Sequence, residues 1–203
     1  FFTIFACMTK ATRTRQFIID KSAPVFNTQG YAGTSLMDLT RATGLSKGAL
    51  YGNFQDKEEI AVAVFQHSME RVREAAQAKM AKAECCKDRL IALFDFYVQY
   101  VFSSPVPGGC PIMNNAVDAD DYHSFLKKAV VKEMRKTTSF IADLLDKGIK
   151  AGEFRQDINS GDLALLFFCS IEGAIVVSRV SSSDTAMKLV LDHCKKIIEQ
   201  ISL

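Results

Sequence analysis

A lysine and two very small residues stand where the sequence predicts the start of a short helix. Ser46 carries a side chain suited to a helix N-cap, and Lys47, Gly48 and Ala49 would form the first turn behind it. The N-terminus of a helix attracts anions, and a first turn without bulky side chains can approach a phosphate backbone and the base edges beside it. The chemistry that these residue types favour is therefore binding to nucleic acid.

The residues before this turn predict another short helix. Ser35 and Asp38 have the S-x-x-D spacing of a capping box, which would start that helix. Gly44 would end it, because glycine tolerates the left-handed conformation found at helix C-termini. The helix that follows is expected over residues 47–54. A helix, a turn with glycine and a short helix with a basic N-terminus together form the pattern of a helix-turn-helix.

Hydrophobic periodicity predicts that the rest of the chain is helical as well, so the fold class is all-α. A helix over residues 14–27 leads into the motif, and Pro24 should bend or break it. Asp56 and Glu59 repeat the capping-box spacing at the start of a long helix over residues 57–82, which would act as a lever between an N-terminal head and the body. The remaining helices are expected at residues 87–102, 112–119, 125–150, 162–180 and 184–202.

Charge is distributed unevenly along the chain. The 203 residues carry a net charge of +2, but residues 8–57 hold seven Lys/Arg against three Asp, which leaves a net of −2 for the remainder. A small basic head on a slightly acidic body fits phosphate binding by the head. Arg13 and Arg15 are either an arm that reaches phosphates or solvated side chains. We therefore predict one domain over residues 8–56 and another over residues 57–203.

Residues 30–60 resemble the DNA-binding segment of the tetracycline-repressor (TetR) family of bacterial regulators. The resemblance rests on the stretch TSLMDLTRATGLSKGALYGNFQDKEEI, and the segment RQFIIDKSAPVFNTQGY resembles the preceding helix of the family. It implies an N-terminal three-helix helix-turn-helix DNA-binding domain and a C-terminal helical domain for ligand binding and dimerisation. It further implies a transcriptional repressor that binds a palindromic operator as a homodimer and is released by a small-molecule effector.

The resemblance also assigns DNA contacts. In the family, the start of the second short helix enters the major groove, and the flanking polar residues hold phosphates. The matching positions in this chain are Thr34, Ser35, Ser46, Lys47, Gly48, Ala49, Tyr51, Asn53 and Lys57. One of them departs from the family pattern, because Asn53 stands where the family usually carries His or Tyr.

The predicted helix over residues 162–180 is apolar on every side, so it must be buried on every side. Two interpretations are open: a core helix within one chain, or a helix that packs on its own core and on a second subunit. Small residues at Ser170, Gly173, Ala174 and Ser178 would allow close approach. The resemblance implies a homodimer through a four-helix bundle of the last two helices, residues 162–202. Two recognition helices about 34 Å apart would then contact two half-sites.

Aromatic and neighbouring residues of the body are candidates for lining an effector cavity, although such residues at helical spacing also form ordinary cores. The candidates are Phe94, Tyr97, Phe102, Cys110, Met113, Phe125, Phe168 and Glu172. Cys110 lies in an irregular loop over residues 103–111, where its thiol either packs or senses oxidants. A regulator gated by oxidation of Cys110 is therefore one alternative function.

No residue set indicates catalysis or metal binding. Asp120 and His123 have a spacing that places both on one helical face, but the chain has three histidines and no E-x-x-H motif, so a solvated surface is expected there. We predict no catalytic residue, no metal site and no cofactor. A binding or enzymatic bundle with a vestigial DNA-binding head is the alternative from another class.

The six cysteines lack metal-finger spacing, which favours reduced thiols in a cytoplasmic protein. Residues 1–7, before Met8, are apolar, but they are too few for a membrane span and lack the charged region of a signal peptide. The apolar helix at 162–180 falls short of the roughly 20 residues that a membrane helix needs. We therefore expect no association with a membrane.

Overall fold

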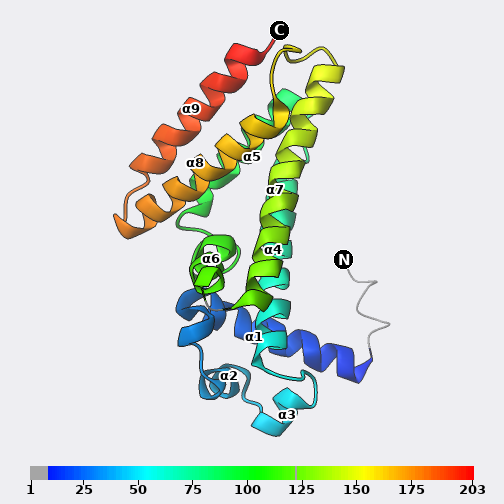
Figure 1. Ribbon diagram of the computed structural model, residues 1–203, viewed down its shortest axis with the longest axis vertical. Coiled ribbons are helices and arrows are strands. Elements are labelled where there is room, and N and C mark those ends of the chain that lie inside the picture. Colours follow the sequence, from blue (N-terminus) through cyan, green and yellow to red (C-terminus); the bar gives the residue numbers. More distant parts are fainter. Residues whose placement is uncertain (1–8, 122) are drawn as a thin grey trace. The chain divides into compact units, whose positions relative to one another are not determined.

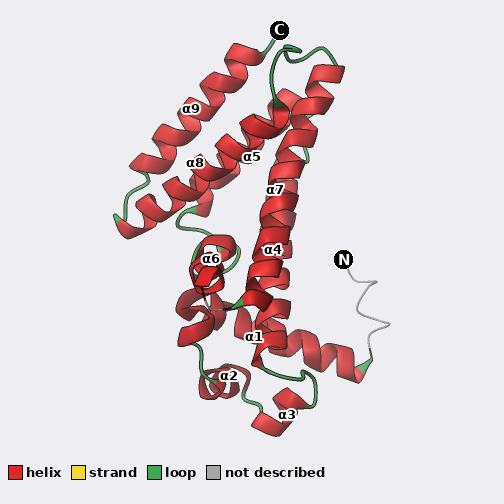
Figure 2. Ribbon diagram, viewed as in Figure 1, coloured by secondary structure: helices red, strands yellow, loops and turns green. Residues whose placement is uncertain are grey.

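The computed structural model describes residues 9–121 and 123–203, and every helix or strand element named within them is an α-helix (Figure 2). The all-α prediction is confirmed. Residues 1–7, for which we predict neither a signal peptide nor a membrane span, lie outside the described residues. In chain order the helices are α1 (Lys10–Gly33), α2 (Leu36–Thr43), α3 (Lys47–Tyr51), α4 (Lys57–Met80), α5 (Cys86–Tyr100), α6 (Pro111–Asp121), α7 (Ser124–Lys150), α8 (Ser160–Val180) and α9 (Thr185–Ile201).

Among the helices whose ends differ from the prediction, α3 and α1 show the differences that matter for the helix-turn-helix. The sequence predicts that α3 reaches residue 54, but it ends at Tyr51, where the poor helix former Gly52 follows. The sequence also predicts a bend or break at Pro24, and the break is wrong. The backbone stays helical through the proline and leaves the helix at Gly30, with φ 72° and ψ 174°. Packing of the buried face of α1 overrides the low helix propensity of proline.

Contacts divide the chain into two compact units. The first holds Phe1–Glu70, of which residues 9–70 are described, together with Val106–Val130; the second holds Arg71–Pro105 and Val131–Leu203. α4 and α7 each contribute residues to both units (Figure 1). The predicted boundary between residues 56 and 57 does not coincide with this division by contacts, and the two functional domains stay a prediction.

One apolar core holds the first unit together. α1 contributes Ile18 and Phe26, α2 contributes Leu39, α3 contributes Leu50 and α4 contributes Ile60, all at most 3% exposed. Burying such a side chain contributes about 1.5–3 kcal/mol. The short helices α2 and α3 each supply few core side chains, so their stability comes from packing onto α1 and α4.

In the same unit, α6 and the loop before it pack against α1. The Asn27 amide donates hydrogen bonds to the carbonyls of Pro107 (2.8 Å) and Gly109 (3.1 Å), and the Asn114 amide donates to the Asn27 carbonyl (2.8 Å). Gly108 has a φ of 107°, and a Cβ there would lie 2.5 Å from the Asn27 carbonyl oxygen. Glycine is therefore required at the point where the loop meets α1.

A carboxylate of α6 binds the last turn of α1. Asp118 accepts hydrogen bonds from the N–H groups of Tyr31 (2.6 Å) and Ala32 (3.3 Å), which directly follow the interruption at Gly30. These N–H groups lose their helical partners at the interruption, so the carboxylate takes the place of a helix cap. The entrance to the helix-turn-helix is in this way tied to α6.

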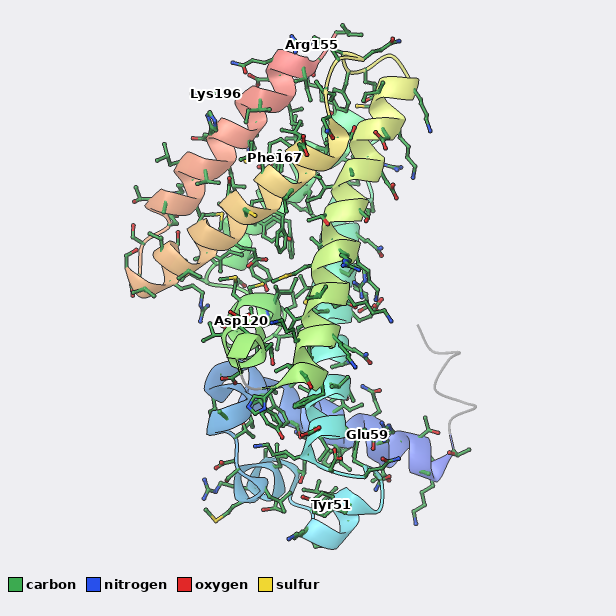
Figure 3. The ribbon with its side chains drawn as sticks, in the orientation of Figure 1. Tyr51, Glu59, Asp120, Arg155, Phe167 and Lys196 are labelled. Carbon is green, nitrogen blue, oxygen red and sulfur yellow. The ribbon has the colours of Figure 1, made fainter. Side chains whose placement is uncertain are left out.

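The second unit is built from longer helices with apolar contacts between them. Phe94 of α5 and Phe167 of α8 are fully buried, and their ring centroids lie 5.2 Å apart in an edge-to-face arrangement; Figure 3 labels Phe167. Lys195 of α9 forms an ion pair with Asp95 of α5 at 2.6 Å. α5, α8 and α9 therefore share one core.

A buried carboxylate joins α7 to the second half of α4. Glu133 is 3% exposed and accepts hydrogen bonds from Arg73 (3.0 Å) and Lys136 (2.6 Å). Burial by itself would raise the pKa of Glu133, but the hydrogen bonds from Lys136 and Arg73 outweigh burial and hold that pKa below its usual value. The group is thus a charged contact within the second unit.

α8 and α9 carry large apolar side chains that are exposed in this unit. These are Leu165, Leu166, Val176, Val177, Val180 and Leu189. Of the small residues singled out in the sequence, Ala174 and Ser178 are buried while Gly173 is exposed. The prediction that α8 is too short for a membrane span is wrong, because α8 begins at Ser160 and has 21 residues. Among the described residues this one helix has the length and composition of a membrane span, with 44% of its most apolar stretch buried.

Candidate nucleic-acid interface

α2 begins with the capping box that the sequence predicts. The Ser35 hydroxyl accepts a hydrogen bond from the Asp38 N–H (3.2 Å), and the Asp38 carboxylate accepts one from the Ser35 N–H (2.9 Å). The side-chain hydrogen bond from Ser35, and then its backbone N–H, hold the pKa of Asp38 below its ordinary value. Ser35 is exposed, so its side chain is accessible to a phosphate.

The turn between α2 and α3 also follows its prediction. Gly44 ends α2 in the left-handed conformation, with φ 69°, and its N–H donates to the Thr40 carbonyl (2.9 Å). Leu39 before the turn and Leu50 after it are both fully buried. The glycine at the turn and one buried leucine from each helix thus hold α2 and α3 in place within the first unit.

α3 presents its first turn to solvent. The Ser46 hydroxyl accepts a hydrogen bond from the Ala49 N–H (3.2 Å), and Lys47 and Gly48 are exposed. Tyr51, labelled in Figure 3, is 39% exposed, and the Lys47 ammonium lies 5.8 Å from the centroid of its ring. A cation, a small exposed turn and a phenol therefore lie together on one helix of five residues.

The residue that departs from the family pattern binds its own helix. The Asn53 amide donates a hydrogen bond to the Ala49 carbonyl (2.9 Å), which is one of the last carbonyls of α3. An amide of this kind has two N–H donors. Asn53 thus caps the C-terminus of α3 and keeps a second donor for another acceptor.

Two of the predicted phosphate contacts are engaged inside the first unit. Thr34 is 1% exposed, and its hydroxyl donates to the Gly30 carbonyl (2.6 Å). The Lys57 ammonium donates to the carbonyls of Tyr31 (2.9 Å) and Thr34 (2.6 Å) and lies 4.1 Å from the Tyr31 ring centroid. Burial lowers the pKa of Lys57, and the Asp118 carboxylate partly opposes this effect. An ammonium has three donors, so one remains for a ligand.

The two arginines near the start of α1 differ. Arg13 is exposed, as expected of an arm or a solvated side chain. Arg15 instead binds Asn53 and Glu59, which are 38 and 44 residues away in sequence. Local sequence patterns cannot reveal partners at such separations, and the sequence analysis missed this contact.

The eight predicted ligand-binding residues are divided between the two units. In the first unit, Cys110 is buried, Met113 is half-buried and Phe125 packs against the Tyr31 ring at 5.1 Å between centroids. In the second unit, most are packed and one, Phe102, is 59% exposed. The other four of that unit are Phe94, Tyr97, Phe168 and Glu172. Their role as an effector site stays a prediction.

An apolar cavity of about 480 Å³ lies between α8 and α9, and none of the eight predicted ligand residues lines it. Its lining consists of Leu166, Phe167, Ser170, Leu189, Val190, His193, Cys194 and Ile197. Two of these, Leu166 and Leu189, belong to the exposed apolar face of the second unit. The cavity is therefore part of that face.

The described cysteines differ in exposure. Cys169 is exposed, while Cys110 and Cys194 are buried. Burial raises the pKa of the Cys194 thiol to about 11. A raised pKa leaves little thiolate, which is the reactive form, so Cys194 is poorly suited to redox chemistry.

The Asp120–His123 pair has partners other than a metal. Asp120, labelled in Figure 3, forms an ion pair with Lys127 at 3.2 Å, and the His123 ring lies 4.6 Å from the Tyr31 ring centroid. Among residues 9–121 and 123–203, no group of three or more His, Cys, Asp or Glu side chains could hold a metal ion.

Two segments of the chain match described families. Residues 18–64 match the family described as "Bacterial regulatory proteins, tetR family", and residues 86–194 match "Tetracyclin repressor-like, C-terminal domain". The second match alone spans more than half of the chain. The two matches correspond to the helix-turn-helix with its neighbouring helices and to the helical body.

Solved structures and curated proteins agree with these matches. A TetR-family transcriptional regulator from Cytophaga hutchinsonii is 36% identical, with a TM-score of 0.90 over 97% of this chain and 98% of that one. A TetR regulator from Chloroflexus aurantiacus J-10-FL is 34% identical, with a TM-score of 0.90 over 96% and 98%. The transcriptional repressor DhaR of Mycobacterium sp. strain GP1 is 22% identical over 94% of this chain and 97% of its own.

One neighbour in fold was solved with nucleic acid. A cysteine mutant of the TetR-family regulator CifR, in complex with 26 bp double-stranded operator DNA, has a TM-score of 0.80 at 19% identity and covers 89% of this chain and 94% of that one. At this identity the likeness concerns the fold alone.

Proposed function

The chain belongs to the TetR family of transcriptional regulators, and from that membership we propose that it is a cytoplasmic repressor that binds a palindromic operator as a homodimer. The observation that carries the proposal is the exposed first turn of α3, capped by Ser46 and anchored from behind by the buried Leu50. A helix presented in this way can enter the major groove with its N-terminal residues against the bases. CifR, a neighbour in fold, was solved on operator DNA.

Contacts to DNA divide into two groups in this proposal. The exposed residues Lys47, Gly48 and Tyr51 meet the groove and its flanking phosphates, with Ser35 on the adjacent helix. The predicted contacts at Ser46, Ala49 and Asn53 act mainly by shaping α3, since their polar groups bind one another along that helix. Thr34 and Lys57 chiefly hold the entrance of α2, and the third donor of Lys57 is the one that reaches a phosphate.

Dimerisation is proposed through α8 and α9. The support is the exposed apolar face defined above, which includes Leu166, Val177 and Leu189 and contains the apolar cavity. Large exposed apolar patches mark interaction sites. A second copy would cover this face and supply the second recognition helix that a palindromic operator requires.

Release by a small molecule is proposed to act through α4 and α7, the helices that contribute residues to both units. A ligand that favours one arrangement of the second unit would change the affinity of the first unit for DNA. Coupling of this kind typically amounts to about 1–3 kcal/mol, or roughly 5- to 150-fold in affinity.

Selection from a pool of randomised duplexes tests the proposal. The protein should enrich a sequence with two inverted half-sites whose centres lie about one helical turn, or a multiple of it, apart. Enrichment of single half-sites would contradict the dimer, and failure to enrich any DNA would favour the helical bundle with a vestigial head. A cognate effector added to the complex with the selected DNA should then lower the affinity of the protein for that DNA by roughly 5- to 150-fold.

A further inference from the structure

Arg15, near the start of α1, contacts three residues beyond α3: Asn53, Phe54 and, in the first turn of α4, Glu59. Its guanidinium donates one hydrogen bond to the Asn53 carbonyl and one to the Glu59 carboxylate (2.6 Å). The guanidinium carbon lies 3.9 Å from the centroid of the Phe54 ring, which is 2% exposed. The planar fork of arginine suits this combination of two acceptors and one ring face.

Glu59 holds the same segment from the other side. Its second carboxylate oxygen accepts a hydrogen bond from the Gln55 N–H (2.7 Å), and its own N–H donates to the Asp56 side chain (2.7 Å). The sequence predicts a capping box between Asp56 and Glu59. In the structure the Asp56 side chain accepts from the Glu59 N–H as such a box requires, but the Glu59 carboxylate accepts from the Gln55 N–H. The Gln55 N–H, followed by the hydrogen bond from Arg15, lowers the pKa of Glu59. Figure 3 labels Glu59 on α4.

The segment that Arg15 and Glu59 contact includes Asn53, which binds the C-terminal end of α3. The Asn53 amide caps the Ala49 carbonyl, and the Asn53 carbonyl is the acceptor for Arg15, so one residue connects α3 to α1. A helix of five residues has little stability of its own in water. Its direction therefore depends on contacts at its ends, which are the Ser46 cap, the buried Leu50 and the Arg15 contacts.

We propose that Arg15 is a positioning residue for DNA binding, which sets the orientation of α3 through Asn53 and Glu59 and makes no phosphate contact itself. This inference rests on the proposed function. Its rival is that Arg15 is an arm residue that binds a phosphate directly. The pairing of its charge with Glu59 and the use of two of its five N–H donors inside the unit, together with its stacking on the buried Phe54 ring, favour positioning.

The two roles differ in how binding depends on salt. A direct phosphate contact releases about one counterion, so its loss makes the slope of log K against log salt shallower by about 0.9. Loss of a positioning contact lowers the affinity but leaves that slope unchanged, because the number of phosphate contacts stays the same. The slope of log K against log salt therefore distinguishes the two roles, because it changes only if Arg15 contacts a phosphate.

The experiment compares Arg15→Met with Arg13→Met on a labelled duplex selected by the wild-type protein. Methionine keeps an apolar chain over Phe54 and removes the donors and the charge, and Arg13 is an exposed arginine of the same helix that loses the same charge. We expect Arg15→Met to weaken binding by about tenfold or more at one salt concentration, with an unchanged salt slope. Arg13→Met should weaken binding less, or reduce the slope if it is an arm residue.

A second variant covers the case in which Arg15→Met fails to fold. Glu59→Gln keeps the shape of the side chain and should lower the affinity at an unchanged slope, while hydrogen exchange at the Gln55 amide speeds up. The effects of the two substitutions should be less than additive, because they act on one contact. A shallower slope for Arg15→Met, or wild-type affinity in both variants, would overturn the inference. A wild-type protein that selects no DNA would instead overturn the proposed function, and the positioning role would fall with it.

Discussion

The α2–α3 segment and the α8–α9 pair present two opposite kinds of surface. α2 and α3 have 8 and 5 residues, and each N-terminus is closed by a serine cap. α8 and α9 have 21 and 17 residues, and their exposed face is formed by leucines and valines. Polar groups and the Lys47 ammonium are exposed on the first pair, whereas the second pair offers apolar area.

The difference teaches which partner each surface suits. Accessible hydrogen-bond donors and the Lys47 cation favour a negatively charged ligand, such as a phosphate backbone. An apolar face gains most from a partner that excludes water, such as a second copy of the same face.

A charge on the apolar face should cause the largest loss. Val177→Asp places a carboxylate on the exposed face of α8, where a second copy would have to bury it without a partner. We expect a monomer in sedimentation experiments and a loss of operator affinity of about a hundredfold or more, because two linked half-site contacts become one. Val117→Asp is the matched control, since Val117 is 77% exposed on α6. Equal behaviour of the two variants would contradict the assignment of the face.

Acid should weaken both units through different carboxylates. Glu59 in the first unit and Glu133 in the second have folded pKa values below the ordinary 4.5, so their stabilisation is present above that pH and is lost as the pH falls through the folded values. Glu133→Gln should cost about 1–3 kcal/mol of unfolding free energy at pH 7 and flatten the loss of stability below pH 4.5.

Glu59→Gln should have a smaller effect on unfolding free energy, because the Glu59 side chain is 36% exposed whereas that of Glu133 is 4% exposed. Thermal unfolding at a series of pH values measures both variants. Acid stability that is identical in the wild type and in Glu133→Gln would contradict the role of the buried carboxylate.

Two helix caps separate stability from DNA binding. Ser46 caps α3, and Asn159 caps α8 by accepting hydrogen bonds from the N–H groups of Gly161 and Asp162. Alanine at either position should cost about 1 kcal/mol of stability. Only Ser46→Ala should also reduce affinity for the operator measured under conditions where both proteins are folded. A similar loss of affinity in Asn159→Ala would remove the contrast between the two regions.

The smallest effect is expected from thiol chemistry. A thiol reagent at pH 8 should label the exposed Cys169 long before Cys194, whose pKa of about 11 leaves very little thiolate. Mass spectrometry of time points gives the order of labelling. If diamide releases DNA and the release survives Cys110→Ser, Cys110 is excluded as a redox sensor.

The sequence predicted the local structure of the interface well because that structure depends on neighbours. Ser35, Gly44 and Ser46 act on residues within four positions, and their caps and turn are observed as predicted. The nine helices of the described residues follow from apolar periodicity in the same way. Their ends shift by up to six residues; α3, for example, ends at Tyr51, where the poor helix former Gly52 follows.

Long-range contacts could not be predicted. Arg15 and Asn53 are 38 residues apart, and Asp118 lies 87 residues from Tyr31. No periodicity connects such pairs, because the tertiary fold alone brings them together. The same reason explains why the sequence did not reveal that the Lys57 ammonium binds the carbonyls of Tyr31 in α1 and of Thr34 just after it; the phosphate contact that the resemblance implies for Lys57 stays a prediction.

The most direct test of the central claim is the salt dependence of operator binding by Lys47→Ala, measured beside the wild type. If the first turn of α3 meets the phosphate backbone, the variant binds more weakly and its slope of log K against log salt is shallower by about 0.9 for each half-site. Unchanged affinity and an unchanged slope would show that α3 does not dock on DNA through this turn.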